Sequence, residues 1–416
     1  MKLLAKLGLL VFSMVFLGSS SVYANPLNYF SWQEINDGSG ISWQPRAGLQ
    51  ALNHRGNFYV MGGRSPKVAP LTFGDSLFYD DVWRSSDQGL SWKKITAAEG
   101  APWAARAYFQ AVRKGRYMYV LGGQDSEPVP NVIDPTCQFL PLPPNTPCPQ
   151  FFLSSNFFND VWRSKNGKNW QLMTDNAKWR GRAGLSAIHH RGWIYVMGGS
   201  VNDDSAIVGA GGPPRIYFND VYRSRNGRKW QKVTDEAPWA PRAGAVLVKR
   251  GKYMYLMGGE DGFQCNEQTP RCPPYYNDVW KSKNGKHWTQ VTNNAGWSPR
   301  PGHQCEVLLG RFICFGGFGL SDDPADPFKP SNPIDVWASY DAKNWTQLSD
   351  TAAPPWNAAG SEDIKYDFAA FPVYFVDGRF NPSIFTFGGD RETFSPFDFN
   401  AFLKVDNDVW QFSLYH

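Results

Sequence analysis

A diglycine follows a short apolar run at six places along the chain. These diglycines are Gly62-Gly63, Gly122-Gly123, Gly198-Gly199, Gly258-Gly259, Gly316-Gly317 and Gly388-Gly389. Adjacent glycines mark points where the backbone turns sharply or closely approaches another segment. Six copies of one pattern predict six copies of one structural unit, stacked so that neighbours bury each other's apolar faces.

The segment from Arg242 to Trp297 shows this unit most clearly. An apolar run reaches a turn at residues 249–251, and a second run, residues 253–257, ends at the diglycine. Two further runs follow, around Val279 and at residues 288–291. Short runs separated by turn residues are typical of antiparallel strands. Each unit is therefore predicted to be a sheet of four strands, named a to d in chain order.

Three markers recur at fixed places in the unit. A basic residue precedes the diglycine by 16 positions in five copies, at Arg46, Arg106, Arg182, Arg242 and Arg300. Strand c opens with Asp-Val-aromatic in all six, at Asp81, Asp160, Asp220, Asp278, Asp335 and Asp408. Strand d carries Trp92, Trp170, Trp230, Trp288 and Trp345. The sixth copy lacks the arginine, and we expect Lys365 to replace it if that hairpin is longer.

Six strands c are followed by only five strands d, because the chain ends soon after Trp410. The missing strand is at the other terminus, where residues 30–35 (Phe-Ser-Trp-Gln-Glu-Ile) precede the first strand a. We therefore predict that this N-terminal strand pairs with the last strand c and closes a ring of six blades.

These markers resemble those of the kelch-repeat β-propellers over nearly all of the chain after residue 24. The resemblance implies an all-β fold, namely a six-bladed propeller of four-stranded antiparallel blades in a single domain, residues 25–416. Most of the 18 tryptophans fall at repeat positions, which favours packing between blades over ligand stacking. The resemblance implies little about activity, since propellers carry many unrelated functions.

The segment from Met1 to Ala24 has the composition of a secretory signal peptide. Lys2 and Lys6 precede an apolar run, residues 7–17, and small residues lead to a predicted cleavage site after Ala24. The six cysteines form three local pairs, Cys137 with Cys148, Cys265 with Cys272, and Cys305 with Cys314. Disulfides are typical of exported proteins. We therefore expect a periplasmic or secreted monomer without a membrane span.

The net charge and the absence of certain motifs exclude several classes of function. The formal charge of +5, or +3 without the signal lysines, is spread along the chain, which argues against a nucleic-acid partner. No P-loop, dinucleotide fingerprint or GxSxG motif is present, so no cofactor is expected. The cysteines lack zinc-site spacing, so no metal is expected either.

The basic residues at the start of strand a have two possible roles. Strand a of a propeller runs nearest the axis, so these side chains are candidates for a ring that binds an anion at the channel mouth. The ring comprises Arg46, Arg106, Arg182, Arg242, Arg300 and Lys365. Alternatively, each pairs with a strand-c aspartate across two blades. The sequence leaves both open.

Long and dissimilar b-to-c connections identify the predicted working face, because variable loops on a rigid scaffold often carry binding sites. Polar residues just after the diglycines are the candidates, namely Arg64, Asp125, Asp203, Asp204, Glu260, Asp261, Asp390, Arg391 and Glu392. We expect a non-catalytic module that binds an extracytoplasmic protein or a glycan through this face. The alternative is an enzyme on an anionic sugar, resembling kelch-type sialic acid mutarotases or sialidases, with Glu260 or Glu362 in acid–base catalysis.

Overall fold

The structure is a computed structural model that describes most of the chain. The described residues are 29–71, 74–132, 136, 148, 150–202, 214–262, 275–320, 330–331, 335–348, 356, 364–391 and 403–414. Several sequence predictions fall outside them, namely the signal segment, Cys137, Cys265, Cys272, Asp203, Asp204, Glu362 and Glu392.

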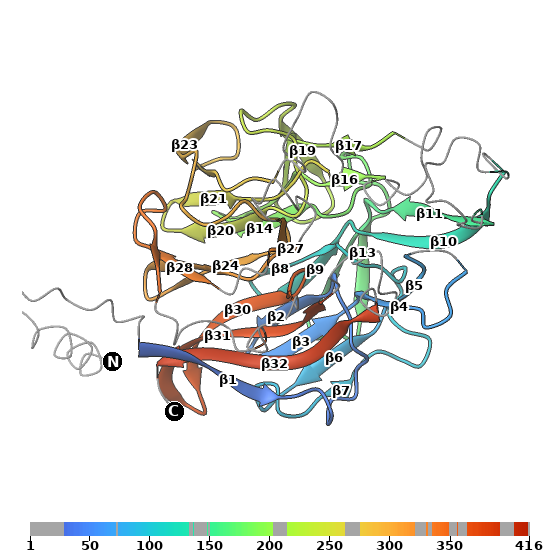
Figure 1. Ribbon diagram of the computed structural model, residues 1–416, viewed down its shortest axis with the longest axis horizontal. Coiled ribbons are helices and arrows are strands. Elements are labelled where there is room, and N and C mark those ends of the chain that lie inside the picture. The colour runs from blue at the N-terminus through green and yellow to red at the C-terminus, as the bar shows by residue number, and fades with distance from the viewer. Residues whose placement is uncertain are drawn as a thin grey trace, which may run out of the picture.

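The chain forms six four-stranded antiparallel sheets arranged as the blades of a β-propeller (Figure 1). Blade 1 contains β2 (Gln50–His54), β3 (Asn57–Met61), β6 (Val82–Ser85) and β7 (Lys93–Lys94). Blade 2 contains β8 (Gln110–Lys114), β9 (Tyr117–Leu121), β12 (Val161–Ser164) and β13 (Trp170–Thr174). Blade 3 contains β14 (Ser186–His190), β15 (Trp193–Met197), β18 (Val221–Ser224) and β19 (Trp230–Thr234).

The remaining blades repeat the pattern. Blade 4 contains β20 (Val246–Arg250), β21 (Tyr253–Met257), β22 (Val279–Ser282) and β23 (Trp288–Thr292). Blade 5 contains β24 (Gln304–Leu308), β25 (Arg311–Phe315), β28 (Val336–Ser339) and β29 (Thr346–Gln347). Blade 6 contains β30 (Ala369–Val376), β31 (Arg379–Asp390), β32 (Val405–Leu414) and β1 (Phe30–Asn36). The predicted all-β, six-bladed fold is confirmed.

Antiparallel order places all a-to-b and c-to-d turns on one side of the disc, the short-turn face, and the b-to-c connections on the other, the long-loop face. Within the described parts of these connections, four two-stranded ribbons rise from the long-loop face. They are β4 (Arg64–Pro66) with β5 (Ser76–Phe78), β10 (Gln124–Pro130) with β11 (Phe151–Phe157), β16 (Ser200–Val201) with β17 (Ile216–Tyr217), and β26 (Gly319–Leu320) with β27 (Pro330–Ser331).

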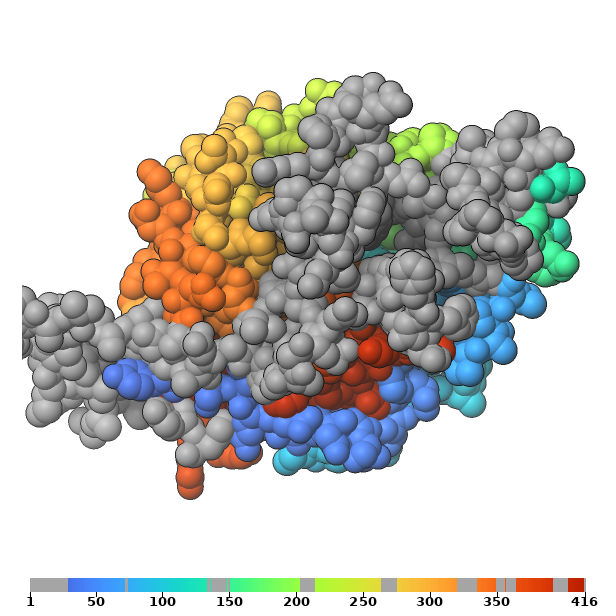
Figure 2. All heavy atoms as spheres, viewed as in Figure 1, coloured from blue at the N-terminus to red at the C-terminus, as the bar shows by residue number. Residues whose placement is uncertain are grey.

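The N-terminal strand closes the ring, as predicted. β1 pairs with β32, so that Phe30 lies opposite Leu414 and Trp32 opposite Phe412. The two strands lie side by side in Figure 1, and in Figure 2 blue N-terminal residues lie against the red C-terminal strand. The first and last parts of the chain therefore share one blade.

Each diglycine is hydrogen-bonded to the backbone of the next blade. The amide of its second glycine donates a hydrogen bond to the carbonyl of the strand-a basic residue in the following blade, at 2.8–3.2 Å. The six bonds join Gly63 to Arg106, Gly123 to Arg182, Gly199 to Arg242, Gly259 to Arg300, Gly317 to Lys365, and Gly389 to Arg46. Both glycines have positive φ, and a Cβ on Gly62 would lie 2.9 Å from the Arg106 carbonyl. Glycine is therefore required by conformation and by close approach.

Tryptophans fill the space between strands, as expected for packing residues. In each of the first five blades the buried link tryptophan meets the strand-d tryptophan edge to face, as Trp43 meets Trp92 at 6.0 Å and 84°. The equivalent pairs in blades 2–5 are Trp103–Trp170, Trp179–Trp230, Trp239–Trp288 and Trp297–Trp345. Edge-to-face geometry suits the aromatic quadrupole. These rings are therefore part of the packed hydrophobic core.

The cysteine prediction is confirmed where it can be followed. Cys305 and Cys314 lie opposite each other on β24 and β25 and form a disulfide. Cys148 is disulfide-bonded, and its predicted partner, Cys137, is outside the described residues. Among the described residues, no helix combines the length and apolar character needed to cross a bilayer.

Ring closure by β1 predicts a strong dependence of stability on Phe30, whose side chain is 1% exposed. Phe30→Ala should lower the free energy of unfolding by about 3–5 kcal/mol, because it leaves a cavity in blade 6. Deletion of residues 25–35 should cost more, since β32 then loses its partner. Tyr29→Ala is the matched control, because Tyr29 is 50% exposed. Urea unfolding that gives equal values for both point variants would contradict the closure.

Candidate functional site

The strand-a basic residues are buried and paired inside their own blades. Arg46 donates to both carboxylate oxygens of Asp81, at 2.5 and 3.1 Å. The same bidentate pair recurs as Arg106–Asp160, Arg182–Asp220, Arg242–Asp278 and Arg300–Asp335, and Lys365 contacts Asp408 at 2.5 Å. Five of the aspartates also accept a hydrogen bond from a strand-c indole, as Asp81 does from Trp83.

These pairs decide between the two roles that the sequence left open. All six basic side chains are at most 2% exposed, and none is among the residues that line the axial cavity. The other donors are occupied as well, since Arg46 also donates to the carbonyls of Gln44 and Gly62. Their pairing with strand-c aspartates is thus observed, within a blade and not between blades. The expected position at the channel mouth is wrong, because the side chains point into the blade.

The mouth of the channel is formed two residues further along strand a. Gly48, Tyr108, Gly184, Gly244, Gly302 and Asp367 occupy equivalent positions there, all with φ between 49° and 63°. Their backbones bond around the axis: Tyr108 donates to Gly48, Gly184 to Tyr108, Gly244 to Gly184, Asp367 to Gly302, and Gly48 to Asp367, at 2.9–3.0 Å. We call these residues the axial ring.

Two members of the axial ring depart from the repeat. Tyr108 and Asp367 stand where four blades have glycine, with φ of 54° and 49°. A left-handed conformation costs a non-glycine residue about 1–2 kcal/mol, although Asp tolerates it better than Tyr does. Backbone strain of this kind gathers at functional sites. Neither residue is among the sequence predictions, although both are visible in the sequence as substitutions of a repeated glycine.

Arg64 of blade 1 contacts Tyr108 of blade 2 and Asp390 of blade 6. Its Nε donates to the Tyr108 hydroxyl at 2.6 Å, and its guanidinium contacts Asp390 at 2.7 Å. The Asp390 side chain is fully buried, whereas the Arg64 side chain remains 14% exposed. Arg64 and Asp390 directly follow the diglycines of blades 1 and 6. Two predicted candidates are therefore brought together with one unpredicted residue, in a polar cluster that spans blades 6, 1 and 2.

A largely buried aromatic cluster lies beside the polar cluster, in blades 4–6. Phe318, which follows the blade 5 diglycine, packs against Tyr366 at 5.6 Å and Tyr275 at 6.0 Å. Tyr366 precedes Asp367 in the axial ring, so the aromatic cluster adjoins the polar cluster. These rings belong to the packed interior, since Phe318 is 3% and Tyr366 is 7% exposed.

The other predicted candidates are dispersed. Glu260, in blade 4, is 7% exposed and its backbone bridges Ala243 and Tyr275. Asp261 accepts a hydrogen bond from the Tyr276 hydroxyl at 2.7 Å, and burial raises the pKa of both groups. Asp125 contacts Asn156 on its own ribbon. Arg391 contacts Asp406 at 3.3 Å. The contacts described here for these four residues are with other residues than those of the Arg64 cluster.

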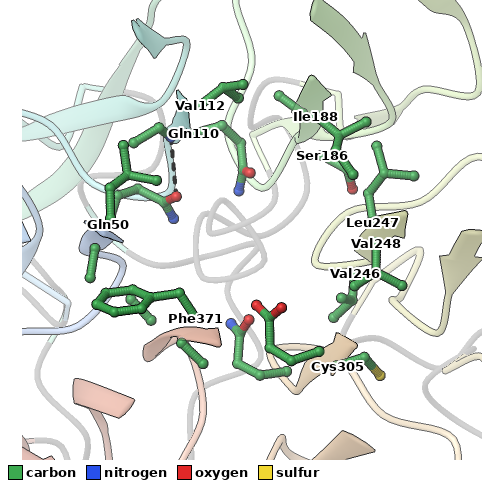
Figure 3. A pocket seen from close by; sticks show the side chains of 18 of the residues that line it. Gln50, Gln110, Val112, Ser186, Ile188, Val246, Leu247, Val248, Cys305 and Phe371 are labelled. Carbon is green, nitrogen blue, oxygen red and sulfur yellow. Dashed lines mark hydrogen bonds between the residues drawn. The ribbon is translucent and has the colours of Figure 1, made fainter. Parts of the chain in front are cut away.

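Below the axial ring lies a cavity of about 560 Å³ along the propeller axis, lined by strand a of every blade. Figure 3 shows Gln50, Gln110 and Ser186 around its open centre. Some polar side chains of the cavity form hydrogen bonds to the neighbouring blade. Gln50 accepts a hydrogen bond from the Ala111 amide, and Ser186 donates one to the Ala245 carbonyl. A pocket of this size suits a small ligand.

Two titratable groups of this cavity were not predicted. Burial, with a smaller contribution from the Arg300 guanidinium, lowers the pKa of His303 to about 3. Burial raises the pKa of the Glu306 carboxyl to about 8. His303 takes the place of Phe109 and Phe368 in equivalent repeats, where it packs against Trp297 at 5.3 Å.

Comparison with known proteins supports the fold. No family model matches the chain. A solved structure described as "Structure of YjhT" is similar over 88% of this chain and 94% of that chain, with a TM-score of 0.55 and 15% sequence identity. At this identity the likeness is one of fold.

The buried pairs predict that Arg182 is structural. Arg182→Ala leaves the Asp220 carboxylate without its partner and should lower the free energy of unfolding by about 3–5 kcal/mol. Arg180→Ala, at an exposed neighbouring position, should change it by less than about 0.5 kcal/mol. Equal denaturation midpoints for the two variants would show that the pair contributes little.

The buried imidazole of His303 predicts that the folded protein is less stable at acidic pH. Its folded pKa of about 3 lies below the unfolded value near 6.5, so its contribution is constant above pH 6.5 and is lost as the pH falls toward 3. The loss is about 1.4 kcal/mol per pH unit, or roughly 2–3 kcal/mol between pH 7 and pH 4.5. His303→Phe should remove this part of the decrease in the free energy of unfolding, measured by urea unfolding at pH 7 and pH 4.5. If the free energy of unfolding differs between pH 7 and pH 4.5 by the same amount in the variant and in the natural sequence, a neutral buried imidazole is excluded.

Proposed function

We propose that this protein is a non-catalytic binding module that takes a glycan at the axial mouth of its long-loop face. The observation that carries the proposal is the break in the repeat: Tyr108 and Asp367 occupy strained positions that are glycine in four blades, on either side of Gly48 in the axial ring, and Tyr108 contacts Arg64. Glycine would be easier to accommodate at both positions. A ligand that contacts the two side chains gives a physical reason for their presence.

The chemistry of the mouth favours a glycan over a protein ligand. Saccharides present many hydroxyl groups, and the Arg64–Tyr108–Asp390 cluster supplies a partly exposed guanidinium and a phenolic hydroxyl that can bond to them. The cavity below is concave and of small-ligand size. A protein partner would more commonly cover a broad surface of roughly 800 Å² on this chain.

Binding without catalysis is favoured by the placement of the carboxylates. Asp390 is held by Arg64, and Glu260 lies in blade 4, which is not adjacent to blade 6. The proposal includes a kelch-type repeat, a single domain over residues 25–416 and export directed by the segment from Met1 to Ala24. The Cys305–Cys314 disulfide is compatible with an oxidising compartment.

Tyr108→Phe tests the site with the smallest change. It removes the hydroxyl that Arg64 contacts at 2.6 Å and keeps the ring. After glycan-array screening has identified a binding saccharide, titration calorimetry should show about tenfold weaker binding by the variant, because the ligand loses a hydrogen bond to the hydroxyl, and Arg64 loses the partner that positions it.

Tyr195→Phe is the matched control, because Tyr195 is buried between blades away from the mouth. It should bind like the natural sequence. No saccharide bound on the array, together with a captured protein ligand, would favour the protein-binding alternative. Equal weakening by both variants would place the ligand elsewhere.

A further inference from the structure

The short-turn face carries an uneven distribution of charge that linear spacing conceals. Strand c and the c-to-d turn read Arg163-Ser164-Lys165 in blade 2, Arg223-Ser224-Arg225 in blade 3 and Lys281-Ser282-Lys283 in blade 4. Blade 1 keeps only the first cation, Arg84, and blade 5 keeps neither, and both have an acidic residue, Asp87 or Asp341, where blades 2–4 have asparagine. The fold therefore gathers cations on three adjacent blades of one face.

Each cation pair surrounds an aromatic residue at the start of strand b. Arg163 and Lys165 lie 4.4 and 5.7 Å from the centre of the Tyr117 ring. Arg223 and Arg225 lie 4.3 and 4.5 Å from Trp193. Lys281 and Lys283 both lie 5.4 Å from Tyr253. Cation–π contact holds the charges in place while the second cation of each pair stays exposed to solvent.

These cations are not neutralised within the described part of the chain. None of the six makes an ion pair with a carboxylate there. Nearer the axis, Lys114 donates to the Gly192 and Arg225 carbonyls, and Lys249 lines the end of the cavity. Burial and the neighbouring Arg225 lower the pKa of Lys114, and burial and Arg113 lower that of Lys249. The surface is short of negative charge.

The other half of the same face exposes apolar side chains. The β30–β31 hairpin of blade 6 has strands of 8 and 12 residues, whereas strands a and b have five each in the other blades. Near its tip, Phe375 and Phe380 are 62% and 65% exposed and pack edge to face at 5.7 Å. Leu309 and Tyr340 of blade 5 are also exposed on turns of this face.

We propose that the short-turn face docks on a membrane surface rich in anionic phospholipids. The cations of blades 2–4 would meet the headgroups, and the Phe375–Phe380 hairpin would enter the interfacial region. Basic residues favour an anionic bilayer surface, and aromatic side chains favour the interface. A soluble polyanion would use the cations but gives no role to the exposed phenylalanines. The combination favours a bilayer, and it leaves the long-loop face turned outward.

Vesicle co-sedimentation of the full chain tests the proposal. We expect binding to phosphatidylcholine vesicles that contain about 30% phosphatidylglycerol at roughly 0.1 M salt, and its loss near 1 M salt. Arg225→Gln combined with Lys283→Gln should weaken binding about 25-fold, since each charge contributes about fivefold. Lys178→Gln combined with Arg180→Gln, an equal charge change on exposed residues of the d-to-a link, is the control and should change it less than about twofold.

The hairpin is tested separately by Phe375→Ser, with Phe380→Ser as a second variant. Each should weaken vesicle binding by about tenfold or more at an unchanged melting temperature, because an exposed side chain contributes little to the fold. Absence of binding to phosphatidylglycerol vesicles would overturn the proposal. Equal affinity for dextran sulfate, with vesicle binding unaffected by both serine variants, would also overturn it and identify a soluble polyanion as the partner.

Discussion

The contact on which the propeller depends is the one between each diglycine and the basic residue of the next blade. The glycine amide reaches the Arg or Lys carbonyl, while that side chain turns back to its own Asp and, in five blades, to its own diglycine carbonyl. One residue thus links two blades through its backbone and two strands through its side chain. A buried guanidinium is tolerated only with such complete pairing. Six repetitions fix the spacing of the blades around the axis.

This arrangement limits where function can reside. The arginines and most tryptophans are the most conspicuous residues of the sequence, and the fold uses them internally. What remains for binding are positions where a blade departs from its copies. Tyr108 and Asp367 depart in the axial ring, and the three cation pairs depart at the c-to-d turns. In a repeat protein the other copies act as internal references for what packing alone requires.

The sequence predicts the fold well because its markers have constant spacing. The number of blades, the closing strand and the substitution of Lys365 for arginine all follow from counting repeats, and β30–β31 is the longer hairpin that Lys365 requires. The site was less predictable. Whether Arg182 faces the axis or its blade depends on a side-chain rotamer, which spacing does not determine. Likewise, Arg163, Arg223 and Lys281 are far apart in the chain and become neighbours only when the blades are placed side by side.

The composite sixth blade has a consequence for biosynthesis. Phe30 is synthesised long before its partner Leu414. Blades 1 to 5 contain only neighbouring segments and can form as they are synthesised, whereas blade 6 must wait for β32. Until then, β1 is an unpaired strand edge, which is prone to pair wrongly. Ring closure is therefore expected to be the final and slowest step of folding, because it brings together the two most distant parts of the chain.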